Sequence, residues 1–303
     1  MGGFERRKLG KTGLEVSPLG IGGGNGISSE DLLYAFDKGI NYFFFSSNLH
    51  HFTYRRSAEA LRKLCSSGSA VRDKVVLATV SYVNDPEKLL PAILDQMSEL
   101  GVDYIDVFHW GWVTERDEFG SLYAAAQQLK DDGLISNQFR WMQHQAGLIN
   151  QELVKLGVAR YVGASFHARS VARQWMDKMD VLMLRYNLAH LGVEKEIFPF
   201  LAEDKDQNPG IVAFNVAHEG SLHFSTPPQG YPSGLYVPTI PDCYRFALTN
   251  PAVDLVLAGL TNRGEVDAAL AALEKGPFNA EEYAFMREYG AMFTRKVRQQ
   301  LAS

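Results

Sequence analysis

This sequence has few cysteines, no long apolar runs and no surplus of basic residues. Of its 303 residues only two are cysteines, Cys65 and Cys243, which excludes a disulfide framework and a CxxC metal motif. No stretch approaches the roughly 20 apolar residues of a membrane span. The charged start lacks a following apolar signal segment. We therefore expect a cytoplasmic protein that makes no membrane contact.

The charge balance points away from nucleic acid. Thirty Lys and Arg residues against 35 Asp and Glu give a net charge of −5, and no dense basic tract is present. An apolar fraction of 46% with 21% charged residues is typical of a globular protein with a full core. A small molecule is therefore the expected partner, while the sequence does not indicate an oligomeric state.

Eight short apolar runs recur along the chain, and each is followed by a helical pattern. They cover residues 19–22, 41–45, 75–80, 105–110, 160–165, 181–186, 210–215 and 253–259. Because they are nearly continuous in Val, Ile, Leu and Phe, they suit parallel strands that are covered on both faces. Eight strand–helix pairs without an intervening linker predict a (β/α)8 TIM barrel in one domain over residues 1–303, in preference to a doubly wound sheet.

Three segments add to this alternation. Residues 112–160 are more than one crossover helix needs, so we expect an extra helical insertion or lid around 115–150. The Pro- and Gly-rich residues 227–234 predict a long loop after the seventh strand. In a barrel, both would lie at the ends where ligands bind. Asn279 is expected to cap a terminal helix.

Several motifs resemble those of the aldo-keto reductase superfamily. Residues 7–22, RKLGKTGLEVSPLGIG, are similar to its opening. Residues 39–44, 104–107, 160–165 and 185–187 resemble its second, fourth, fifth and sixth strands. These segments span nearly the whole chain in the right order, and the resemblance implies the same barrel that the periodicity predicts.

The resemblance also implies NADP(H)-dependent carbonyl reduction by a Tyr, Lys, Asp and His tetrad. At those four positions this chain has Leu49, Val80, Phe44 and Gly111. Reduction of a carbonyl leaves an alkoxide that needs a proton, and the neighbouring ammonium makes a tyrosine competent to supply it near neutral pH. With Phe44 and Val80 both apolar, we expect the ordinary mechanism to be absent.

The residues that would hold the cofactor are only partly retained. The family's Ser-Asn pair aligns with Ser165-Phe166, its Gln with Met183, and its basic residue for the adenosine phosphate with Glu265. A carboxylate beside a phosphate is repulsive. We favour no cofactor, with NADP(H) as the alternative. If a nicotinamide nucleotide binds, the resemblance implies contacts from Ser165, Phe214, Asn215, Thr261, Asn262 and Arg263.

Histidines gather near the carboxyl ends of the predicted strands, which form the functional face of such a barrel. They are His50, His51, His109, His167, His190, His218 and His223, with His144 in the insertion. By alternation His109 points into the barrel, one layer below Gly111. We predict His109 as a catalytic acid or base, with His50, His51 or Tyr54 as its partner. A core histidine, a polar loop and a packed tyrosine remain the structural alternatives.

Six further residues are candidates for substrate binding, namely Phe44, Trp110, Trp112, His167, Arg185 and His190. Their aromatic share suggests an apolar or aromatic substrate, with Arg185 available for a carboxylate or phosphate. Core packing, loop capping and an internal ion pair are the alternatives. We predict no metal site, because HxH, HxxxH and HExxH patterns and inward carboxylates are missing.

Three functions follow from these observations. The first is a cofactor-independent enzyme of the lyase or isomerase type, which dehydrates, isomerises or cyclises a small molecule through His and Tyr acid–base chemistry. The second is an NADP(H)-dependent oxidoreductase with displaced catalytic residues. The third is a ligand-binding protein without catalysis. The sequence favours the first.

Overall fold

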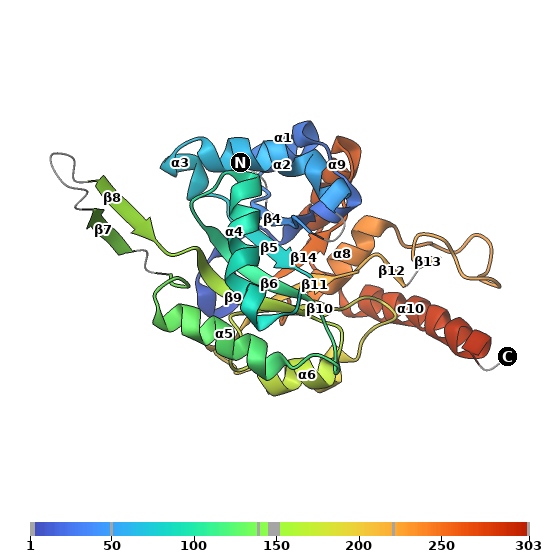
Figure 1. Cartoon of the computed structure of the whole chain (residues 1–303). Coiled ribbons are helices and arrows are strands. Elements are labelled where there is room, and N and C mark those ends of the chain that lie inside the picture. The colour runs from blue at the N-terminus through green and yellow to red at the C-terminus, as the bar shows by residue number, and fades with distance from the viewer. Residues whose placement is uncertain (1–3, 49–50, 138–139, 145–151, 220–221, 302–303) are drawn as a thin grey trace.

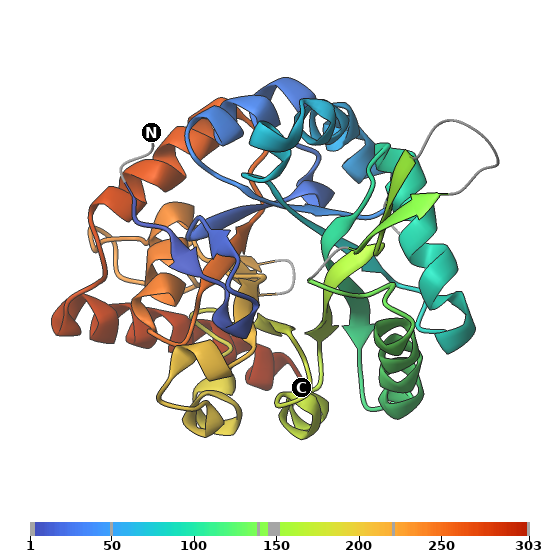
Figure 2. The same cartoon turned by 90° about the vertical axis from the view of Figure 1, so that its left-hand side faces the viewer.

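Eight parallel strands close into a barrel in the computed structural model, which describes residues 4–48, 51–137, 140–144, 152–219 and 222–301. The barrel strands are β3 Leu19–Gly22, β4 Tyr42–Phe45, β5 Val76–Ser81, β6 Ile105–Val113, β9 Ala159–Phe166, β10 Val181–Arg185, β11 Gly210–Phe214 and β14 Leu255–Ala258. Each predicted run supplies one of them. The (β/α)8 barrel is therefore confirmed, and Figure 2 views it from its amino-terminal end, with helices around the ring of strands.

Helices surround the barrel (Figure 1). They are α1 Ser29–Asp37, α2 His51–Ser66, α3 Ser69–Arg72, α4 Leu89–Leu100, α5 Phe119–Asp131, α6 Arg169–Trp175, α7 Val193–Glu196, α8 Ile240–Thr249, α9 Arg263–Glu274 and α10 Ala280–Leu301. Their ends follow local signals. Gly101 ends α4 in the left-handed conformation with φ of 61°. The Asn279 side chain accepts a hydrogen bond from the Glu282 amide, so the predicted start of the terminal helix is confirmed.

The strand register decides which side chains fill the barrel. Phe44 pairs with Ala78, and Val80 with His109, which in turn pairs with Gly163. Because paired residues of parallel strands project to the same face, these side chains share the interior. Trp110 projects outward instead, and its ring packs on Phe119 of α5 with centroids 5.5 Å apart.

A buried charge network lies near the amino-terminal end of the barrel. Asp106, near the start of β6, accepts hydrogen bonds from Arg72 at 2.8 Å and Arg160 at 2.9 Å. The Leu77 amide donates to the same carboxylate at 2.9 Å. Asp106 is 1% exposed, so these contacts join β5, β6, β9 and the end of α3 inside the protein.

The predicted helical insertion is wrong. Strands β7 Arg140–His144 and β8 Glu152–Leu156 form an antiparallel hairpin there, and α5 is the ordinary crossover helix. The Ser136 amide donates to the Ala159 carbonyl at the start of β9, so the hairpin leaves the barrel at its amino-terminal end. It projects away from the pocket end (Figure 1) and is no lid. The number of extra residues does not distinguish an inserted helix from an inserted hairpin.

Two short strands follow β11 at the opposite end. β12 His218–Glu219 pairs antiparallel with β13 Leu222–His223. Residues 227–234, which come next, contain turns and no helix or strand, so the predicted loop is confirmed. None of the helices in the described ranges is both long and apolar enough to cross a bilayer.

Candidate functional site

The β4–β6 side of the barrel mouth is closed by packed side chains. Phe44 is 5% exposed, and its ring meets the imidazole of His109 edge-on with centroids 5.6 Å apart. Val80 is fully buried. A Cβ at Gly111 would lie 2.4 Å from the Tyr82 ring and 2.8 Å from Val80, so Tyr82 fills the space above this glycine. No charged group is found at Phe44, Val80 or Gly111, which the resemblance aligns with three of the tetrad positions, while Leu49 lies outside the described residues.

His109 lies deeper in the barrel and is completely buried. Its Nδ1 donates to the Thr79 carbonyl at 3.2 Å, which leaves Nε2 as the acceptor, and Nε2 has no hydrogen-bond partner among the described residues. Burial lowers the pKa of this imidazole to about 4, so it stays neutral. A Cβ at Gly163 would lie 2.7 Å from the ring, so the histidine fits because residue 163 is glycine.

The predicted partners of His109 are placed elsewhere. Tyr54 is 5% exposed in α2 and shares a side-chain hydrogen bond with Tyr82. Burial raises the pKa of both tyrosines, so both keep their protons. His50 lies outside the described residues, and His51 begins α2 but its side chain is not described. Tyr82 was missed in the sequence, although its spacing of two from Val80 placed it on the same face.

A row of three rings crosses the mouth. Trp112, at the end of β6, lies 5.8 Å from the ring of His167, which lies 5.3 Å from Phe214. Trp112 is 54% exposed and has φ of 62°, a left-handed conformation that costs a residue with a side chain about 1–2 kcal/mol. Burial and then the charge of Arg185 lower the pKa of His167. Trp110, in contrast, is 1% exposed behind the barrel wall, and this placement does not support substrate binding by Trp110.

A polar relay lies beside this row. With its amide oriented to satisfy its neighbours, Asn215 accepts through its oxygen from Arg185 Nε and Nη2 at 3.0 Å each. The Asn215 nitrogen donates to His218 Nε2 at 2.6 Å. Arg185 Nη1 also lies 3.4 Å from His190 Nε2. The left-handed backbone of Asn215, with φ of 55°, is held by Asn187, which donates to the Asn215 carbonyl at 2.8 Å.

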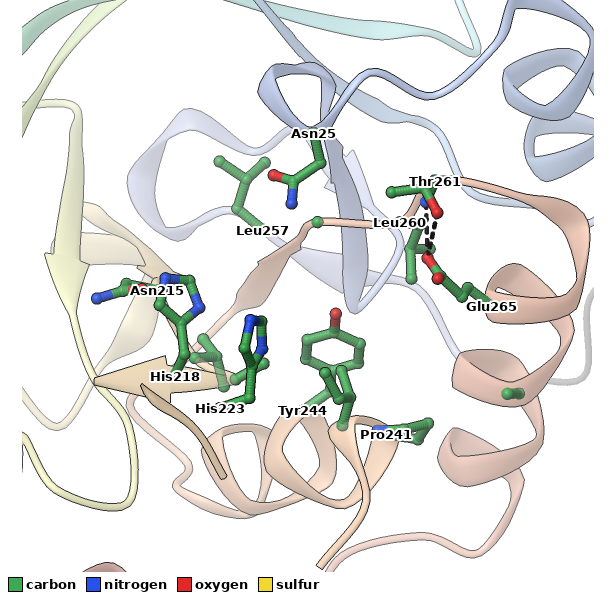
Figure 3. Close-up of a pocket in the computed structure, with 15 residues that line it drawn as sticks. Asn25, Asn215, His218, His223, Pro241, Tyr244, Leu257, Leu260, Thr261 and Glu265 are labelled. Carbon is green, nitrogen blue, oxygen red and sulfur yellow. Dashed lines mark hydrogen bonds between the residues drawn. The ribbon is translucent and has the colours of Figure 1, made fainter. Parts of the chain in front are cut away.

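A pocket of about 360 Å³ opens next to the relay at the carboxyl end of the barrel. Figure 3 shows His218, His223 and Tyr244 facing this space opposite Asn25 and Leu260. The rings of His218 and His223 lie 5.3 Å apart. The size falls within the range of small-molecule sites, about 300–1,000 Å³. Of its lining residues, Asn215 and Thr261 were predicted. Tyr244, Asn25 and the importance of His218 and His223 were missed.

The start of α9 borders the same pocket. The Thr261 amide and Oγ1 both donate to Glu265 Oε2, at 2.8 and 2.9 Å. The Asn262 side chain accepts from the Glu265 amide at 3.1 Å. Arg263 donates to Asp31 of α1 at 3.2 Å and also pairs with Glu30. The side chains of Thr261, Asn262 and Arg263, which were predicted to contact a nucleotide, therefore already form hydrogen bonds with other residues of this chain.

Comparison with known proteins settles the relationship. The model of the aldo/keto reductase family matches residues 27–232. The chain belongs to the aldo/keto reductase family. It is 22% identical to L-galactose dehydrogenase from Arabidopsis thaliana, over 89% of this chain and 88% of that protein.

Solved aldo/keto reductases share the barrel. The holo form of aldo-keto reductase AKR11C1 from Bacillus halodurans superposes with a TM-score of 0.68 at 19% identity, over 94% of this chain and 96% of that one. Its apo form gives a TM-score of 0.66 at 20% identity, over 94% and 95%. These likenesses support the fold assignment.

NADP(H), the cofactor of the aldo/keto reductase family, would meet an altered site in this member. Ser165 is 7% exposed, and the next residue, Phe166, is buried against Phe119 with centroids 5.2 Å apart. Met183, which the resemblance aligns with an amide residue of the family, is likewise buried. Phe214 keeps a partly open ring that could stack on a flat group. The residues present therefore do not fit the family's usual way of holding this cofactor. In the described ranges, no three His, Cys, Asp or Glu side chains cluster as metal ligands.

Proposed function

We propose that this aldo/keto reductase family member is a small-molecule enzyme that moves protons and transfers no hydride, as in dehydration, isomerisation or cyclisation. One observation carries the proposal. No charged side chain stands at Phe44, Val80 or Gly111, the positions that the resemblance aligns with the tetrad. The relay of Arg185, Asn215 and His218 borders a pocket at the same end of the barrel. The nearest tyrosines, Tyr54 and Tyr82, have raised pKa values, and no ammonium group of the described residues is among the causes that act on them. They are therefore poor proton donors to an alkoxide.

His218 is the proposed proton-transfer group. Asn215 orients its ring by donating to Nε2, and Arg185 fixes the Asn215 amide, so the proton of the neutral ring lies on Nδ1. The exposed His223 ring beside it can exchange the proton with solvent. Trp112, His167 and Phe214 would bind an apolar or aromatic body, with His190 at the edge. His109 is sealed beneath Phe44, so we assign it no contact with the ligand, which revises the choice made from the sequence.

The test is proton exchange on a flat aromatic ketone. Acetophenone in D₂O, followed by proton NMR, should lose its methyl protons faster with the wild-type protein than with buffer. His218→Ala should reduce the enzyme-dependent rate by about 100-fold, the scale of a general acid–base group. His144→Ala, a histidine on the hairpin at the far end of the barrel, is the matched control and should change nothing. Equal rates for wild type and His218→Ala would contradict the assignment.

An NADP(H)-dependent oxidoreductase with displaced residues is the second candidate. Family membership, a relative named as a dehydrogenase and the partly open Phe214 ring favour it. Titration of NADPH with protein should quench nicotinamide fluorescence if this candidate is correct. Quenching together with NADPH oxidation in the presence of an aldehyde would replace the first proposal with this one.

A further inference from the structure

The geometry points to a pocket that accepts an uncharged, hydroxyl-bearing group beside α9 and rejects a phosphate there, because the Glu265 carboxylate already accepts hydrogen bonds at the start of this helix. This inference rests on the proposed function in one respect, which is that both use the same pocket. It adds to that proposal the class of ligand that the pocket takes. It concerns the end of the pocket formed by Thr261, Glu265 and Leu260.

Parallel barrels frequently bind phosphate at the loops after their last two strands, where a helix presents unpaired amide groups. In this chain two of the donors, the amides of Thr261 and Glu265, are already used. Glu265 Oε2 accepts from both the amide and the hydroxyl of Thr261, at 2.8 and 2.9 Å. The Glu265 amide itself donates to Asn262 at 3.1 Å. A phosphate would have to displace a carboxylate of the same charge sign to reach them.

The nearby cation does not offset this charge. Arg263 points toward α1, where it pairs with Glu30 and with Asp31, and its guanidinium lies 5.0 Å from the Tyr34 ring. The described residues that line the pocket include no lysine and no arginine, and Glu265 is their one carboxylate. The field at this end of the pocket is therefore negative and repels an anion.

The same groups suit a ligand with hydroxyls. A carboxylate accepts hydrogen bonds from sugar hydroxyls, as acidic residues do with ribose in dinucleotide-binding folds. Asn25 and Tyr244 add polar atoms, and Leu257 and Leu260 add apolar wall (Figure 3). The expected ligand class is an unphosphorylated ring that carries hydroxyl groups.

The test compares adenosine with adenosine 2′-monophosphate, two probes that differ by one phosphate, by isothermal titration calorimetry. Wild-type protein should bind adenosine at least about 10-fold more tightly. Glu265→Gln, which keeps the shape and removes the charge, should reduce this preference to about 3-fold or less. Adding Asp31→Asn, which weakens the hold on Arg263, should favour the phosphorylated probe further. Glu274→Gln, at the other end of α9, is the matched control and should keep the wild-type ratio.

Three results would overturn the inference: wild type binding the phosphorylated probe as tightly as adenosine, wild type binding neither probe, or an unchanged ratio in Glu265→Gln. Thermal melts of each variant check that it is folded. Because binding is measured and not turnover, failure here leaves the role of His218 in acetophenone exchange intact. Loss of that role would equally leave the probe preference standing.

Discussion

Near the amino-terminal end of the barrel, Asp106 is buried with Arg72 and Arg160 as ion-pair partners. At the carboxyl end, the β4–β6 sector carries the buried apolar side chains of Phe44 and Val80, and polar groups gather on the β10–β14 side. The molecule thus has a buried ion-pair network at one end and polar groups around a pocket at the other, an arrangement that agrees with the usual separation of stability and function in such barrels.

The largest expected effect is at the amino-terminal end. Asp106→Ala leaves the Arg72 guanidinium, with 8% side-chain exposure, without its carboxylate, and should reduce the free energy of unfolding by about 3–5 kcal/mol in urea titrations. Asp206→Ala, which breaks the exposed pair with Lys8, is the control and should leave the free energy of unfolding nearly unchanged. Similar losses in both variants would show that burial of the Asp106 network does not matter.

Returning charge to the mouth should also be costly. Val80→Lys places an ammonium in a fully buried apolar position and should lower the free energy of unfolding by about 2–4 kcal/mol at pH 7. Adding Phe44→Asp should recover about 1–2 kcal/mol, because the two new charges pair. A double variant whose loss equals the sum of the two single losses would contradict the view that these positions form one site.

The pH dependence of stability should report His109. Its folded pKa of about 4 lies below the unfolded value near 6.5, so the unfolded state binds the proton first as the pH falls. The part of the free energy of unfolding that depends on the neutral imidazole is fully present above pH 6.5. It decreases by roughly 2–3 kcal/mol as the pH falls from 6.5 to 4. Urea titrations at pH 7, 5.5 and 4.5 should therefore show a shallower acid loss for His109→Asn than for wild type. Parallel curves would be the contrary result.

The smallest effect on stability is expected at Trp112. Replacement by glycine removes left-handed strain but adds backbone freedom to the unfolded chain, and the two effects nearly cancel, to within about 0.5–1 kcal/mol. The loss of an exposed ring should still weaken acetophenone binding several-fold, as measured by NMR titration. Unchanged affinity would contradict the proposed contact between Trp112 and the ligand.

The fold was largely readable because local patterns decide it. Continuous apolar runs flanked by helix caps give eight strand–helix units, and closure of the barrel follows from their number. The β7–β8 hairpin was missed because the length of residues 112–160 shows how much extra chain is present but not whether it forms a helix or a hairpin. Its place between α5 and β9 determines the end of the barrel from which it projects.

The site was readable only in part. Alternation identified His109 as an inward residue, and the resemblance drew attention to Phe44, yet neither shows depth, and burial of His109 depends on the missing side chain of Gly163 on the neighbouring strand. The relay from Arg185 to His218 depends on a left-handed turn at Asn215, which no spacing rule reveals. Glu265 was recognised as unfavourable for a phosphate, but its hydrogen bonds to Thr261 needed coordinates.

The placement of the β7–β8 hairpin has a practical consequence. It leaves the barrel at the end opposite the pocket, so a surface tether or fluorescent label attached there keeps the pocket face toward solution. An immobilised protein held through this arm would present its mouth in one orientation. The loops around the pocket and the coupling chemistry on the β7–β8 hairpin can then be varied independently.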